Sequence, residues 1–225
     1  MQGEAGMKVF VVAMACEAET VVRHLADVRR ETLFGREVVQ GTLDGTGTAV
    51  VVAGVGKVNA AAGAQLALGA LRARALLNVG VAGGLDTHLR VGDILRATRA
   101  VQYDFDLSRI NGTPVGTPNE CQTPYFELAA APGDWPAATV ATGDRFLDDE
   151  GENDLLRRTF GANVREMELG AIAHVASRAD VPLYAWKAIS DVAGQGTMSG
   201  QYKINLDRCL EILAREVPAL FAAVP

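Results

Sequence analysis

The chain has 225 residues, of which 49% are hydrophobic, and this length and composition favour one large domain with a single core. A formal net charge of −6 argues against a nucleic-acid backbone or an anionic membrane as a partner, because both attract basic surfaces. The three cysteines have no CxxC spacing, so they predict neither a zinc ribbon nor a disulfide framework and fit a reducing cytoplasm.

Residues 1–6 precede a second methionine, Met7, and we expect them to be a short leader or a cloning remnant. The domain is therefore predicted to span residues 7–225. No apolar stretch has the length of a bilayer span, and the N-terminus lacks the basic and apolar regions of a signal peptide. These features predict a cytoplasmic protein without a membrane partner.

The first quarter of the chain predicts a strand, a helix and a hairpin. Residues 8–14 are a β-branched apolar run of strand length, and residues 17–28 carry apolar side chains at helical spacing. Residues 37–43 and 48–53 flank the turn signal Asp44-Gly45-Thr46-Gly47, which predicts that the two segments pair as antiparallel strands.

The rest of the chain alternates strands and helices between glycine and proline breakers, which predicts an α/β domain with a mixed, twisted central sheet flanked by helices in three layers. The expected elements are a helix over 57–72, a buried strand over 75–80, strands over 93–103, 139–142 and 164–168, helices from about 150 and over 169–179, a buried strand over 183–189, and a final helix that Pro218 should kink or end. Residues 107–136 hold five of the eight prolines and predict a long loop.

Unusual residues follow several predicted strands, at the sheet edge where open α/β sheets bind ligands. Glu17 follows the first strand, the glycine-rich stretch Gly80–Gly84 follows the buried run over 75–79, and Ser190-Asp191 follow the buried strand over 183–189. Glu166-Met167-Glu168 lie where a strand meets a helix, but periodicity alone does not decide which glutamate enters a site. Structural uses are also open: Glu17 as a first-turn helix glutamate and Asp191 as a helix N-cap.

Three better-known motifs are absent. Gly54-Val55-Gly56-Lys57 resembles the end of a phosphate loop, but Val51 and Val58 stand where that motif needs glycine and Ser/Thr. The stretch Gly80–Gly84 lacks GxGxxG spacing and is expected to be a tight strand-to-helix turn. The three histidines are scattered, so we expect no metal and no cofactor.

Five motifs in chain order resemble the 5′-methylthioadenosine/S-adenosylhomocysteine nucleosidases, within the nucleoside phosphorylase superfamily. They are Ala13-Met14 with Glu17, Gly80-Val81-Ala82-Gly83-Gly84-Leu85, Val91-Gly92-Asp93-Ile94, Glu166-Met167-Glu168 and Ala188-Ile189-Ser190-Asp191. The resemblance covers nearly the whole chain. It implies the superfamily's fold and the hydrolysis of a purine nucleoside at its N-glycosidic bond.

The resemblance also implies roles for individual residues. Glu17 would activate water, Asp191, oriented by Ser190, would protonate the purine, and Glu168 would bind the ribose hydroxyls with Met167 beside the sugar. In the stretch Gly143-Asp144-Arg145-Phe146-Leu147, Phe146 would stack on the base and Leu147 would offer it backbone hydrogen bonds. Val81 and Gly83 would line the same site.

Two alternative functions remain open at this point. A phosphorylase of the same superfamily would need cations for phosphate, but neither Ala15–Glu19 nor Asn78–Val81 contains arginine or lysine, so hydrolysis is favoured. A nucleoside-binding protein without activity would be expected to lack one of the three carboxylates, and all three are present.

The chain departs from the family in two places. Residues 107–116, in the region where the family builds an apolar pocket for the 5′ substituent, contain no aromatic residue and include Arg109 and Asn111. In related enzymes this loop comes from a neighbouring subunit, so the resemblance implies a homodimer. Lys187 stands where an arginine is usual.

Overall fold

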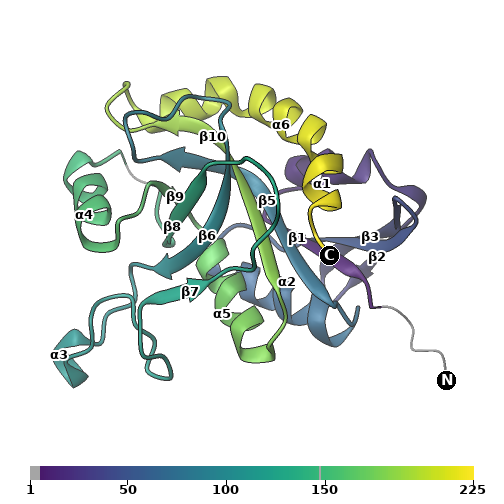
Figure 1. The fold of residues 1–225 in the computed structure, drawn as a ribbon, viewed down its shortest axis with the longest axis horizontal. Coiled ribbons are helices and arrows are strands. Elements are labelled where there is room, and N and C mark those ends of the chain that lie inside the picture. Colours follow the sequence, from purple (N-terminus) through teal and green to yellow (C-terminus); the bar gives the residue numbers. More distant parts are fainter. Residues whose placement is uncertain (1–5, 147) are drawn as a thin grey trace.

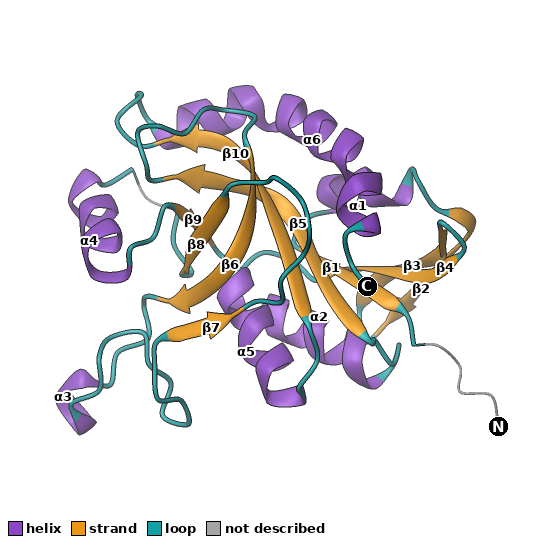
Figure 2. Cartoon of the chain, in the orientation of Figure 1, coloured by secondary structure: helices purple, strands orange, loops and turns teal. Residues whose placement is uncertain are grey.

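The computed structural model describes residues 6–146 and 148–225, so Leu147 and residues 1–5 of the expected leader lie outside the described residues. One mixed sheet forms the middle layer (Figure 2). Its strands are β1 (Lys8–Val12), β2 (Ala26–Leu33), β3 (Arg36–Leu43), β4 (Thr46–Val52), β5 (Ala75–Gly84), β6 (Ile94–Gln102), β7 (Tyr125–Glu127), β8 (Ala137–Thr142), β9 (Val164–Glu166) and β10 (Leu183–Val192). The helices are α1 (Ala15–Val22), α2 (Lys57–Gly69), α3 (Ser108–Asn111), α4 (Glu150–Phe160), α5 (Leu169–Ala179) and α6 (Met198–Ala222).

The helices cover the sheet on both faces, as the sequence predicted. Helices α1 and α6 lie on one side and α2 and α5 on the other (Figure 1). Each side has its own buried cluster, one built around Val9, Val11 and α2, the other around Phe10, Val12 and α6. Strand β1 alternates between these clusters because successive strand residues point to opposite faces, and this is why the four residues after Lys8 are all apolar.

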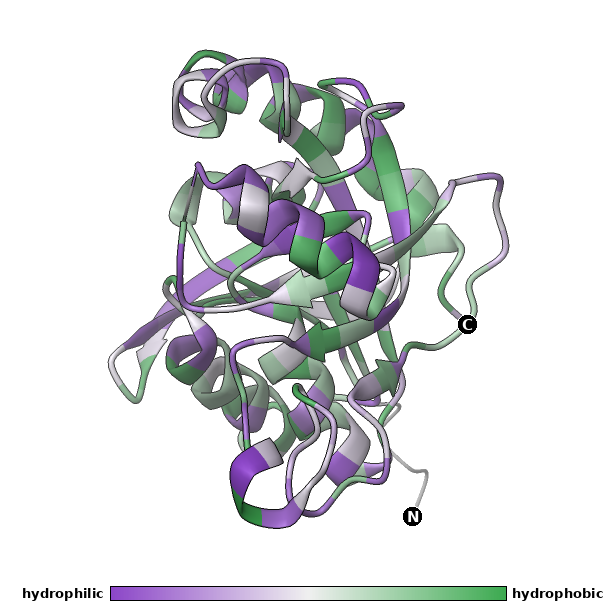
Figure 3. Ribbon diagram, turned by 90° about the vertical axis from the view of Figure 1, so that its left-hand side faces the viewer, coloured by the Kyte–Doolittle hydropathy of each residue, from purple (hydrophilic) through white to green (hydrophobic). Residues whose placement is uncertain are grey.

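The sheet closes on itself at one end. Strand β10 pairs in parallel with β5 and antiparallel with β6, while β9 pairs with both β8 and β5, so β5, β10, β6, β8 and β9 form a ring. Strands β1, β4, β3 and β2 continue the sheet outward from β5. In Figure 3, where the chain is coloured by hydropathy, apolar (green) segments run along strands in the interior, while the peripheral loops are of mixed colour.

Small side chains let the alanine-rich helix α2 approach the sheet closely. A Cβ added at Gly63 would lie 2.6 Å from the Cβ of Ala53, closer than side-chain carbons tolerate. The alanine and glycine content of the helix makes this close packing possible. None of the helices in the described part of the chain is long and apolar enough to cross a membrane.

The predicted helix over 17–28 is wrong in its second half. Helix α1 ends at Val22, and β2 begins at Ala26 and pairs with β3 at the edge of the sheet. Seven of the eight β2 residues are exposed, so this edge strand shows no apolar alternation that could mark it in the sequence. Asp27, with φ of 54°, stands where the pairing register shifts.

Three further expectations are corrected. The Gly80–Gly84 stretch is not a strand-to-helix turn, because β5 continues through Gly84 and the next element is β6. The expected loop over 107–136 contains α3 and β7, and β7 pairs with β6. Of the two outcomes expected at Pro218, a kink or an end of the helix, the second is wrong, because α6 continues to Ala222. The proline occupies the last turns of the helix, where its missing N–H removes only one backbone hydrogen bond.

Candidate active site

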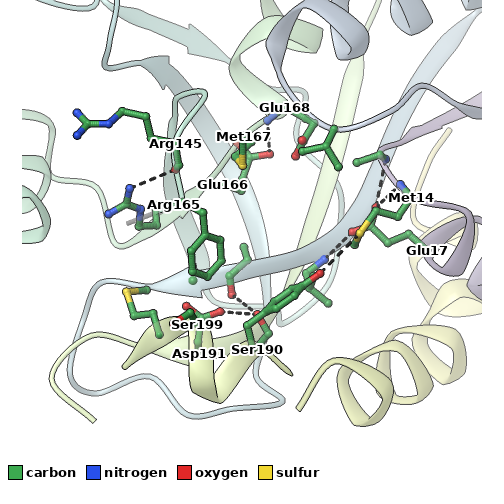
Figure 4. Close-up of a pocket in the computed structure, with 18 of the residues that line it drawn as sticks. Met14, Glu17, Arg145, Arg165, Glu166, Met167, Glu168, Ser190, Asp191 and Ser199 are labelled. Atoms are coloured by element: carbon green, nitrogen blue, oxygen red, sulfur yellow. Dashed lines mark hydrogen bonds between the residues drawn. The ribbon is translucent and has the colours of Figure 1, made fainter. Parts of the chain in front are cut away.

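A cavity of about 330 Å³ opens where the ends of β1, β5, β9 and β10 meet the first turns of α1, α5 and α6 (Figure 4). Eight of the nine residues predicted from the sequence line it: Glu17, Val81, Gly83, Phe146, Met167, Glu168, Ser190 and Asp191. The ninth, Leu147, lies outside the described residues. Segments as far apart in the chain as those of Glu17 and Asp191 therefore contribute to a single site, because their strands end at the same edge of the sheet.

Glu17 projects from the first turn of α1 into the cavity and is buried. Its Oε2 accepts hydrogen bonds from the backbone N–H groups of Ala13 (3.1 Å) and Met14 (3.0 Å), and its Oε1 accepts one from Val81 (3.1 Å). The expected structural use is thus present, since the carboxylate caps its own helix, but the same group also faces the cavity. Burial raises the pKa of Glu17, against the opposing effects of Lys187 and these N–H donors.

Gly80 provides the space for this carboxylate. A Cβ at position 80 would lie 2.5 Å from Oε1 of Glu17, well inside contact distance. The glycine-rich part of β5 therefore serves as a surface against which Glu17 and, at Gly83, the carboxylate of Asp191 approach the backbone. This explains why a central strand carries glycines that weaken strands elsewhere.

Asp191 lies near the end of β10. It is not a helix N-cap, because the N-cap of the next helix, α6, is Thr197. The pairing of β10 with β5 shifts register between Ile189 and Asp191, so Ser190 forms a bulge. In a regular strand consecutive side chains face opposite sides, whereas here both Ser190 and Asp191 line the cavity.

The bulge also sets the hydrogen bonding of Asp191. The hydroxyl of Ser190 donates to Oδ2 at 2.6 Å, while the buried Oδ1 has no hydrogen-bond partner among the described residues. Burial raises the pKa of Asp191 to about 6, although the hydrogen bond from Ser190 opposes this. A carboxyl group that has this pKa and belongs to a residue lining a cavity is suited to donate a proton to a ligand.

The two glutamates of the Glu166-Met167-Glu168 segment have different surroundings. Glu166 accepts hydrogen bonds from the backbone N–H groups of Glu168 and Leu169 and from the hydroxyl of Thr142. Glu168 accepts one hydrogen bond, from the backbone N–H of Gly56 at 2.8 Å. Burial, followed by the charge of Glu166, raises the pKa of Glu168 to about 7. Glu168 is therefore the glutamate with acceptor capacity left for a ligand.

The Gly54–Lys57 turn, which does not form a phosphate loop, takes part in the site in another way. Gly56 has φ of 96°, a conformation that favours glycine, and this turns its N–H toward Glu168. The next N–H, of Lys57, donates to Asp144 at 2.7 Å. Asp144 thereby fastens the loop that carries Phe146 to the start of α2.

Phe146 is the most exposed aromatic side chain of the site. It is 49% exposed, lines the cavity and contacts Tyr202 edge to face, with 5.7 Å between the ring centres. A large apolar ring left half in water at a cavity wall is suited to stack on a planar ligand. Met167 lines the cavity from the turn before α5.

Other cavity residues were not identified from the sequence. Arg165 is buried and donates to Glu152 at 2.9 Å and to Asn153 at 2.8 Å, and its guanidinium group points toward Arg145 (Figure 4). Its charge opposes the rise in the pKa of Asp191. The residues of α6 that line the cavity are two adjacent pairs about one helical turn apart, Met198 with Ser199 and Tyr202 with Lys203. That spacing, just after Ser190-Asp191 in the chain, was a signal that could have found them. No residue of the predicted 5′ loop, 107–116, is among the described residues that line the cavity.

The chain belongs to the phosphorylase superfamily, whose family model matches residues 8–222. This confirms the superfamily that the five sequence motifs indicated, and with it the three-layer α/β fold.

Solved structures of several nucleosidases have the same fold. The 5′-methylthioadenosine/S-adenosylhomocysteine nucleosidase of Helicobacter pylori matches with a TM-score of 0.88 and 23% identity, over 97% of this chain and 99% of that one. The S-adenosylhomocysteine nucleosidase of Streptococcus pyogenes matches with a TM-score of 0.88 and 23% identity, over 99% of both chains. The futalosine hydrolase of Helicobacter pylori matches with a TM-score of 0.87 and 23% identity, over 96% of this chain and 97% of that one.

Proposed function

We propose that this protein, as a single domain over residues 7–225, hydrolyses the N-glycosidic bond of an adenine nucleoside and releases adenine and the ribose derivative. The observation that carries the proposal is the shared cavity of Glu17, Glu168 and Asp191, each of which enters from a different element. The similar structures of the Helicobacter pylori and Streptococcus pyogenes nucleosidases support the choice of an adenine nucleoside. The substrates to test are 5′-methylthioadenosine, S-adenosylhomocysteine and 5′-deoxyadenosine.

The reaction needs one acid and one base. Asp191, in its protonated form, donates to N7 of the base as the bond between C1′ and N9 breaks, so adenine leaves as a neutral molecule. Glu17, in its ionised form, accepts a proton from water, and the water oxygen bonds to C1′. The net reaction consumes one water, and exchange with solvent restores both carboxyl groups.

The remaining predicted residues position the nucleoside. Glu168 would bind the ribose hydroxyls through its free acceptor capacity, with Met167 beside the sugar, and Phe146 would stack on the base. Ser190 keeps the carboxyl group of Asp191 oriented by its 2.6 Å hydrogen bond. Val81 and Gly83, on β5, line the cavity wall against which the nucleoside would lie.

Water is favoured over phosphate as the nucleophile. The Glu17 carboxylate already occupies the backbone N–H groups of Ala13, Met14 and Val81, which are the donors that an anion at this place would need. A carboxylate in that position also repels phosphate. Hydrolysis is therefore the proposed reaction, and phosphorolysis is the outcome against which it is tested.

We also propose that two copies of the chain assemble and that residues 107–116 of each complete the site of the other. The loop includes helix α3, which projects away from the body of the molecule (Figure 1), and Ile110 on it is 81% exposed. A cytoplasmic location is proposed because the three cysteines are free thiols. Light scattering at micromolar concentration tests the dimer, and Ile110→Asp should yield a monomer.

The experiment that tests the function is incubation of the purified protein with each candidate nucleoside, with and without phosphate, followed by chromatography of the products. We expect free adenine and a free pentose derivative at the same rate under both conditions. A rate that rises with phosphate together with a pentose 1-phosphate product would establish phosphorolysis instead. Binding of the nucleosides without release of adenine would identify a binding protein without catalytic activity.

A further inference from the structure

Lys187 is a buried lysine that the proposed chemistry does not use. It lies in the middle of β10, between β5 and β6, and its side chain is 2% exposed. A buried ammonium group destabilises a protein unless partners compensate its lost hydration. The groups that contact the ammonium group of Lys187 therefore indicate its role.

The ammonium group of Lys187 holds Glu166. Its Nζ donates to Oε2 of Glu166 at 3.0 Å, and the glutamate side chain is 3% exposed. The same Oε2 accepts the backbone N–H groups of Glu168 (3.1 Å) and Leu169 (2.8 Å), which begin helix α5. Through Glu166, Lys187 is thus linked to the backbone of the residue proposed to bind the ribose.

Thr142 supports the same arrangement from β8. Its hydroxyl donates to Oε1 of Glu166 and accepts the N–H of Gly170 at 2.8 Å, one residue further into α5. Both carboxylate oxygens of Glu166 are therefore engaged within the protein, although the residue lines the cavity. Glu166 acts as a fixed support for the start of α5, not as a ligand for substrate.

Charge points to the same role. Burial lowers the tendency of Lys187 to carry its charge, but Glu166, then Glu168 and Glu17, outweigh this effect and raise its pKa. In return, the positive charge of Lys187 opposes the rise in pKa that burial imposes on Glu17 and Glu168. Without Lys187, three carboxyl groups would share a buried region with less compensation.

We propose that Lys187 is a positioning residue that holds Glu166 and, through it, fixes the backbone and carboxylate of Glu168 for the ribose. This inference rests on the proposed function, because it assigns Lys187 to the ribose-binding part of that site. The hydrogen bonds from Lys187 to Glu166 and from the amides of Glu168 and Leu169 to Glu166 do not require a ligand, so they can be tested in the ligand-free protein.

The first test is backbone amide hydrogen exchange in the ligand-free protein, measured by NMR for Lys187→Met, Lys187→Arg and the control Lys8→Met. Lys8 is a second buried lysine, which donates to the carbonyl of Val224 at the other end of β1, away from the cavity. We expect Lys187→Met to speed exchange of the Glu168 and Leu169 amides at least tenfold, while Lys187→Arg and Lys8→Met leave them within threefold. Unchanged protection of these two amides in Lys187→Met would overturn the proposal.

The second test is kinetic and uses a double-mutant cycle with Glu168→Gln. We expect Lys187→Met to lower kcat/KM at least tenfold in the wild-type background but less than threefold in the Glu168→Gln background, with activity restored by Lys187→Arg. Equal losses in both backgrounds would show that Lys187 acts independently of Glu168. If the wild-type protein releases no adenine, the proposed function fails, and the amide-exchange test still decides the role of Lys187.

Discussion

Replacing Asp191 with asparagine should remove activity and raise stability at the same time. Burial places the pKa of Asp191 at about 6, above its ordinary value of 3.8, so the folded protein favours the protonated form. Its contribution to stability is complete below pH 3.8 and is lost as the pH rises through about 6. With about 1.4 kcal/mol per pKa unit, ionised Asp191 destabilises the fold by at most about 3 kcal/mol at pH 7–8.

Asparagine has nearly the same shape and no charge, so Asp191→Asn should recover part of this free energy. A gain of 1 kcal/mol corresponds to a rise in Tm of about 2–4 °C in a domain of this size. The loss of the general acid should lower kcat by about 10²–10⁴-fold. Because only protonated Asp191 is active, the wild-type rate should fall about tenfold per pH unit above pH 6.

Calorimetric unfolding at pH 5 and pH 8, combined with adenine release over the same pH range, measures both effects. Asp180→Asn is a matched control, because Asp180 is an exposed carboxylate at the end of α5 with φ of 53°, which asparagine tolerates. The control should change neither property. An Asp191→Asn protein that keeps its activity, or that is less stable than wild type at pH 8, would refute the reasoning.

Three further predictions concern the general base Glu17, the glycine that makes room for it, and the aromatic ring proposed to stack on the adenine. Glu17→Gln should lower kcat by about 10²–10⁴-fold with a smaller change in KM, and a KM effect alone would contradict its role as the base. Gly80→Ala should abolish most activity because its Cβ would lie 2.5 Å from Oε1 of Glu17. Gly69→Ala, with open space around it, should leave the rate unchanged. Equal rates for both variants would exclude the steric argument. Phe146→Ala should raise KM about 2–10-fold, as expected for loss of stacking worth about 0.5–1.5 kcal/mol. Phe34→Ala, which removes an exposed ring outside the cavity, should leave KM unchanged. An equal rise in KM for both variants would contradict stacking by Phe146.

The strands that carry the site could be predicted because they are buried on both faces. Strands β1 and β10 appear in the sequence as short apolar runs, and the residues after or near their ends, Glu17 and Asp191, stood out as carboxylates beside buried segments. Edge strand β2 could not be predicted in this way. Its exposed side chains are held by backbone pairing with β3, which leaves no apolar pattern in the sequence.

Other features of the site depend on contacts between distant segments. Glu166 and Glu168 differ because Thr142, Lys187 and two backbone N–H groups donate to the first, whereas the second accepts the N–H of Gly56. Lys187, an unexplained departure from the family pattern in the sequence, becomes interpretable once its distance to Glu166 is known. Local periodicity contains no information of this kind.

The sequence by itself determined the alternation of strands and helices, the burial of the central strands and the identity of the carboxylates near the strand ends, because these follow from hydrophobic spacing and local turn chemistry. Only the tertiary structure decided which of those groups share a cavity. The bulge at Ser190, the closure of the sheet through β10 and the docking of α6 against that edge set the site, and each depends on pairing between segments far apart in the chain.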